Sequence, residues 1–182
     1  MKRKMLITLS LVGIALVTLG ASDSCRAPMD ATGDYTGIWS INIKEGETVV
    51  DTAECGAIRM TLTQDVTLDP PDNLKVTGII TTDDYACFEA AGWPKPLIPK
   101  AEPVEVAGTM NAQDGKLLLV SGGLGTGSGA IFIIDGLGEA DAQSAEEIPP
   151  MIGYSGTWGF AVSVVFIGTA GVGGTFEVTR DN

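Results

Sequence analysis

The side chains that many enzymes use for nucleophilic and metal chemistry are scarce in this chain. Its 182 residues include three cysteines and no histidine. Without an imidazole, Ser-His-Asp and Cys-His catalytic sites cannot form, and metal sites that need histidine are excluded. The cysteines, Cys25, Cys55 and Cys87, have no C-x-x-C spacing and do not indicate a zinc site. We therefore expect a protein that is not an enzyme and has no metal and no cofactor.

Carboxylates are the remaining candidates for acid–base chemistry, because two of them could catalyse glycoside hydrolysis. The chain has 23 acidic and 11 basic residues, for a net charge of −12. Among so many acids, pairs such as Asp83-Asp84 and Glu146-Glu147 are better interpreted as solvated loop charges. An acidic surface repels nucleic acid, so we exclude nucleic acid as a partner.

The start of the chain has the composition of an export signal. A basic start at residues 2–4 precedes an apolar run at residues 5–19, and small residues follow. The apolar run is about 15 residues long, which is too short for the roughly 20 residues of a membrane-spanning helix. We therefore divide the chain into a signal peptide (1–24), an N-terminal tether (25–33) and a single domain (34–182).

Cys25 stands where a bacterial lipoprotein carries its lipidated cysteine. The three residues before it, Ser22-Asp23-Ser24, resemble the lipoprotein signal because a small residue precedes the cysteine. They depart from it at the first position, where leucine is usual, and at the second, where an acid is unusual. The resemblance implies a lipid anchor at Cys25, and Arg26 resembles an outer-membrane sorting residue. The alternative is ordinary cleavage near Ala21, which would give a periplasmic or secreted protein.

The other two cysteines form a natural pair. In an oxidising compartment an odd number of cysteines leaves one thiol unpaired. If Cys25 carries lipid, Cys55 and Cys87 remain. A disulfide between them would close a loop of about 30 residues and contribute about 3–4 kcal/mol to stability. The alternative is two separate buried thiols.

Short runs of alternating or continuous apolar residues dominate the rest of the chain, whereas sustained helical spacing is absent. These runs predict eight strands, centred on residues 39–43, 58–62, 74–80, 104–110, 117–120, 130–134, 158–166 and 176–178. Stretches rich in glycine, proline, asparagine or aspartate predict turns at 69–73, 111–115, 121–129 and 169–174. Eight strands with mostly short connections favour an all-β, antiparallel up-and-down barrel, because closure removes the sheet edges. A β-sandwich is the alternative.

Two further patterns concern aromatic residues. The segments Tyr35–Trp39 (YTGIW) and Tyr154–Trp158 (YSGTW) are similar and each opens a strand. Two strands that begin in similar positions of a barrel would explain this similarity without an ancestral duplication. The long connection at 82–103 contains Cys87 and the apolar stretch Trp93–Pro99, which could cover a barrel mouth or bind a partner. We favour packing on the outside of the barrel, with Cys87 as the tether.

The Gly37-Ile38-Trp39 pattern on the first strand and Arg180 on the last resemble the signature of the calycins, the lipocalin and avidin group. In that group the first-strand tryptophan packs near the closed end of the barrel, and an arginine of the last strand lies across it. The resemblance implies that Trp39 and Arg180 form a barrel-closing pair, with about 0.5–2 kcal/mol from the arginine–indole contact. The chain departs from typical lipocalins because it lacks an obvious C-terminal helix.

Two functions are consistent with these features. The first is an exported, lipid-anchored binding module that holds a small apolar ligand, since an eight-stranded barrel can enclose one. The candidate ligand-binding residues on the barrel wall are Met60, Leu62, Val106, Met110, Trp158 and Phe160. The second is a structural or interaction protein of the cell envelope with a barrel filled by side chains. The expected partners are the membrane, through the anchor, and either a small apolar ligand or an envelope protein.

Overall fold

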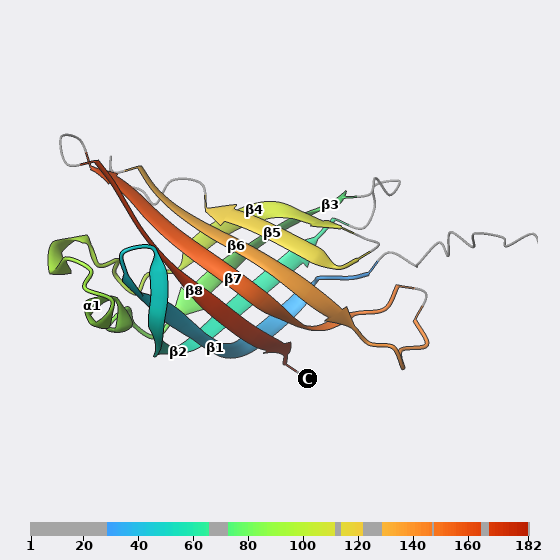
Figure 1. Ribbon diagram of the computed structural model, residues 1–182. Coiled ribbons are helices and arrows are strands. Elements are labelled where there is room, and N and C mark those ends of the chain that lie inside the picture. Colours follow the sequence, from blue (N-terminus) through green and yellow to red (C-terminus); the bar gives the residue numbers. More distant parts are fainter. Residues whose placement is uncertain are drawn as a thin grey trace, which may run out of the picture.

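The strands of this protein close into a barrel. The computed structural model describes residues 29–65, 73–111, 114–121, 129–146, 148–164 and 168–181. Eight antiparallel strands follow one another in sequence order, and the last pairs with the first (Figure 1). They are β1 (Gly33–Glu45), β2 (Thr48–Gln64), β3 (Asn73–Thr82), β4 (Val104–Asn111), β5 (Lys116–Ser121), β6 (Gly129–Ala140), β7 (Met151–Val164) and β8 (Gly168–Arg180). The predicted eight-stranded antiparallel up-and-down barrel is confirmed.

Helical structure in the described residues is limited to the connection between β3 and β4. It comprises α1 (Cys87–Ala90) and a 3-10 helix, η1 (Lys95–Leu97). No helix in the described part of the chain is long and apolar enough to cross a membrane. The predicted signal peptide and Cys25 lie outside the described residues.

Strict alternation along the strands separates the core from the surface. On β5, Leu117 and Leu119 are buried whereas Leu118 and Val120 between them are exposed. The same period of two appears on β2 and β4, because successive side chains of a strand point to opposite faces. The buried side chains of all eight strands form one continuous core inside the barrel.

The two ends of the barrel are covered differently (Figure 1). We call the end beneath residues 83–103 the α1 end, because α1 lies there beside the β1–β2 hairpin. At the opposite end residues 29–31 pack on the barrel, with Met29 and Ala31 buried. There the Gln64 side chain accepts a hydrogen bond from the Ala31 N–H at 2.9 Å and donates one to the Met29 carbonyl at 3.0 Å. Residues 29–31, which the sequence assigns to the tether, therefore help to close the core.

One predicted turn is wrong. The glycine-rich stretch 169–174 lies inside β8. A Cβ on Gly173 would stand 2.7 Å from the carbonyl oxygen of Trp158, and one on Gly174 would overlap the carbonyl oxygen of Ser40. These glycines are therefore needed because the backbones of β7 and β1 approach β8 closely on its two sides, and not because the chain turns.

A second predicted turn is confirmed. Between β4 and β5 the Gly115 N–H donates to the Asn111 carbonyl at 2.9 Å, and Gly115 has a φ of 74°, in the left-handed region that favours glycine. The predicted turns at 69–73 and 121–129 fall largely on residues outside the described part of the chain.

Candidate functional site

The six predicted wall residues all point into the barrel. Met60, Leu62, Val106, Met110, Trp158 and Phe160 belong to the buried core, and none is more than 5 % exposed. Met60 and Met110 have no exposed surface at all, so no water-sized space adjoins them. The sequence therefore identified inward-facing residues correctly, but these side chains are packed against their neighbours.

An aromatic cluster fills the α1 end. Its rings come from β1, β6, β7 and the connection before β4: Trp39, Tyr85, Phe88, Trp93, Phe132, Trp158 and Phe160. Phe88 lies at its centre and is fully buried. Its ring stacks on Trp158 at 5.8 Å and meets Phe160 edge-on at 5.9 Å. Only Trp158 and Phe160 of this cluster were among the predicted wall residues. Phe88 carried no periodic sequence signal, because it lies in an irregular connection.

The apolar stretch after α1 belongs to the same cluster. The Trp93 ring lies 6.0 Å from Phe160, which faces the interior of the barrel. Its indole N–H donates to the Leu97 carbonyl at 2.9 Å, so the segment folds back on itself. The favoured interpretation, packing on the outside of the barrel, is corrected: this segment covers the end of the barrel.

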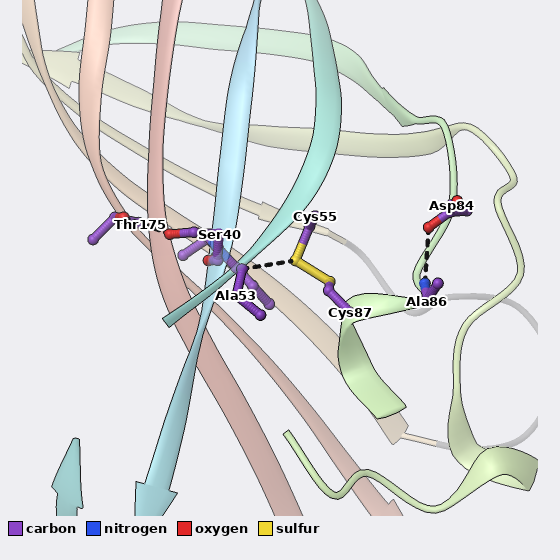
Figure 2. The surroundings of a disulfide bond; sticks show 8 residues. Ser40, Ala53, Cys55, Asp84, Ala86, Cys87 and Thr175 are labelled. Carbon is purple, nitrogen blue, oxygen red and sulfur yellow. Dashed lines mark hydrogen bonds between the residues drawn. A yellow bond between two sulfur atoms is a disulfide. The ribbon is translucent and has the colours of Figure 1, made fainter. Parts of the chain in front are cut away.

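A disulfide ties this cover to the wall. Cys55 of β2 is bonded to Cys87, the first residue of α1, across a sequence separation of 32 residues (Figure 2). The predicted pairing is confirmed. A second link, the ion pair of Arg59 with Asp83 at 2.9 Å, joins β2 to the start of the cover. Both of its side chains are more than half exposed, so it contributes little to stability.

The three tryptophans differ in their hydrogen bonds. Trp158 donates its indole N–H to the Ser40 carbonyl at 2.8 Å, and Trp93 donates to Leu97. The Trp39 N–H is buried and has no acceptor among the described residues. Trp39 is 1 % exposed, and its ring lies 4.8 Å from Trp158 and 5.4 Å from Tyr85. A buried unpaired donor costs about 1–3 kcal/mol, so this atom calls for an explanation.

The predicted contact of Arg180 with Trp39 is corrected. Both residues lie on the β1–β8 seam that closes the barrel, but Arg180 pairs with Tyr35 whereas Trp39 pairs with Phe176. A separation of four positions corresponds to about 13 Å along a strand. The Arg180 Nε lies 2.9 Å from where a Cβ on Gly33 would stand, on the side away from Trp39. The strand register, which the motif does not specify, separates the two side chains.

The two similar segments meet inside the barrel. The rings of Tyr35 and Tyr154 are 5.2 Å apart, just as Trp39 and Trp158 meet at the α1 end. Burial raises the pKa of Tyr35 to about 12, against an opposing effect of Arg180, and burial also raises the pKa of Tyr154. Both phenols stay neutral at neutral pH, so they do not supply a general base.

The outer face carries an unusual group of side chains. Four aliphatic residues of β5 and β6 point outward next to one another and are 37–44 % exposed: Leu118, Val120, Ile131 and Ile133. We call this group the aliphatic stripe. On the adjacent β7 the outward positions are occupied by Gly159 and Ala161, which have little or no side chain.

The described residues contain no group of three acidic or cysteine side chains arranged to hold a metal ion. Comparison of the chain with protein-family models, with curated proteins and with solved structures finds no match. The resemblance to the calycins therefore stays a prediction.

Proposed function

We propose that this protein is a non-enzymatic, lipid-anchored module of the bacterial cell envelope that binds a protein partner through its outer surface. The barrel is then a rigid scaffold filled by its own side chains. The observation that carries the proposal is the contrast between inside and outside. The six inward wall residues are at most 5 % exposed, whereas the aliphatic stripe is about 40 % exposed on a face that needs no apolar residues.

The stripe has the properties of a contact surface. Val120 and Ile133 are paired across β5 and β6, and Ala107 continues the apolar surface onto β4. Contiguous exposed apolar patches mark interaction sites more often than isolated exposed residues do. The Lys116–Asp135 ion pair, 3.9 Å long, lies at one edge and supplies a polar rim. A partner that presents a flat apolar face with few acidic groups would fit it.

Substitution in the stripe tests the proposal. We would purify the full-length tagged protein, the Ile133→Glu variant and the Ile38→Glu variant from the native envelope. Ile38 is a matched control because it is an exposed aliphatic residue on β1, away from the stripe. We expect a stoichiometric partner with the wild type and with the control, and its loss from Ile133→Glu. Equal recovery with both variants, or no partner with any of the three, would contradict the proposal.

The ligand-binding hypothesis takes second place. A ligand along the barrel wall would need space beside residues such as Met60 and Met110, and their side chains have no exposed surface. Export and lipid attachment at Cys25 are proposed from the sequence. Intact-mass measurement of the denatured protein checks them, because diacylglycerol and an amide-linked fatty acid add mass that Cys25→Ala removes.

A further inference from the structure

We infer that the α1 end of the barrel is a closed binding site for a single aromatic ring that carries one hydrogen-bond acceptor, with Phe88 of α1 occupying the place of that ring. The inference concerns the inside of one barrel end. It does not rest on the proposed function of the outer surface.

Phe88 lies in a cage made for one ring. Five aromatic side chains surround it at centroid distances of 5.4–6.2 Å: Trp39, Tyr85, Trp93, Trp158 and Phe160. Trp158 stacks on its face, whereas Tyr85, Trp93 and Phe160 approach it edge-on. Both arrangements are the favourable ones for aromatic pairs, so any single ring at this position is recognised on its face and on its edges.

The cage has one polar group that Phe88 does not satisfy. Trp39 is only 1 % exposed, and its indole N–H has no acceptor among the described residues. Trp93 and Trp158, in the same cluster, both have acceptors. A hydrocarbon ring such as that of Phe88 cannot accept a conventional hydrogen bond. A ligand ring with a carbonyl or ether oxygen would supply what the cage lacks.

Phe88 enters the cage from the connection between β3 and β4 and not from the barrel wall. It belongs to α1, a four-residue helix in a long connection, and not to a barrel strand. Its neighbour Cys87 is bonded to Cys55 of β2, which keeps α1 in place. The seven aromatic side chains of the cluster are therefore divided between a fixed wall and a tethered cover. A ligand competes with Phe88 for the cage, so its apparent affinity for the intact protein is reduced by the rarity of the open form.

Removal of the Phe88 ring provides the first test. We would titrate the full-length Phe88→Ala variant with acetophenone and with α-methylstyrene, which have the same shape but differ in one C=O against C=CH₂. Calorimetry gives the affinities, and nitrogen–proton correlation spectra follow the three indole N–H signals. We expect binding of acetophenone with a downfield shift of the Trp39 signal. In the double variant Trp39→Phe, Phe88→Ala the indole N–H is absent. We expect the affinity for acetophenone, divided by the affinity for α-methylstyrene, to be about tenfold lower there than in Phe88→Ala.

A second variant keeps all the aromatic side chains and breaks the covalent link between α1 and β2. Cys55→Ser with Cys87→Ser should bind acetophenone more tightly than the wild-type protein, because α1 is no longer tethered, and more weakly than Phe88→Ala. This variant also decides the matter if Phe88→Ala does not fold. The inference is overturned if neither variant binds acetophenone. It is also overturned if the Trp39 N–H signal does not move when acetophenone binds. The same holds if the ratio of the affinities for acetophenone and α-methylstyrene is unchanged without Trp39, since the indole N–H would then not donate to the ligand.

Discussion

Gly37 tests whether β1 and β8 close the barrel as described. A Cβ at this position would overlap the carbonyl oxygen of Glu177 and stand 2.6 Å from the Cα of Val178. Both contacts are with the backbone of β8, so rotation of a side chain cannot relieve them. Gly37→Ala must therefore push the two strands apart at the seam. We expect the free energy of unfolding to fall by about 2–4 kcal/mol, from the overpacking and from weakened hydrogen bonds along the seam.

Gly159 on β7 provides the matched control. A Cβ there meets no atom within 4 Å, and its φ is not among the positive values. Gly159→Ala should therefore raise the free energy of unfolding by about 0.4–1 kcal/mol, because alanine has less freedom than glycine in the unfolded chain. Urea unfolding of the oxidised proteins, followed by tryptophan fluorescence, measures both. If Gly37→Ala is as stable as the wild type, or if the two variants shift equally, β1 and β8 do not approach as the structure shows.

Three further predictions concern the disulfide, the barrel end opposite α1 and the dependence of stability on pH. Replacing Cys55 and Cys87 with serine should lower the free energy of unfolding by about 3–4 kcal/mol, and an unchanged urea midpoint would contradict the loop-closure argument. Gln64→Leu leaves two backbone groups unpaired and should cost about 2–4 kcal/mol in the same assay, with a cost below half that counting against it. Burial raises the pKa of Tyr35 to about 12 in the folded protein. The contribution of Tyr35 to the free energy of unfolding is therefore complete below about pH 10 and is lost as the pH rises through 12. Tyrosinate absorbance from Tyr35 in the folded protein should thus appear only near pH 12, and its appearance near pH 10 in a folded protein would refute this.

The sequence predicted the barrel because each strand has one face inside and one outside. Alternation such as that around Leu117 and Leu119 therefore reports both the strand and its orientation. The cysteine pair was also predictable, since assignment of Cys25 to lipid leaves only Cys55 and Cys87 to pair in an oxidising compartment.

The features that fix the α1 end could not be predicted in the same way. Phe88 lies in an irregular connection, where no periodicity marks a residue as buried. The distance between Trp39 and Arg180 depends on how β1 and β8 are registered, and a short motif does not encode register. The unpaired N–H of Trp39 depends on tertiary packing, which the sequence pattern of β1 does not report. The role of the glycines in 169–174 could not be predicted either, because glycine is favoured both in turns and where two strands approach closely.

Native mass spectrometry of the full protein from its own envelope tests the filled barrel most directly. Spectra are compared under native and denaturing conditions, with the disulfide intact. If the barrel is filled by its own side chains, denaturation releases no small-molecule mass, while any lipid at Cys25 remains in both spectra. Release of a small molecule in stoichiometric amount would show that the wild-type interior holds a ligand, and would contradict a barrel filled by its own side chains.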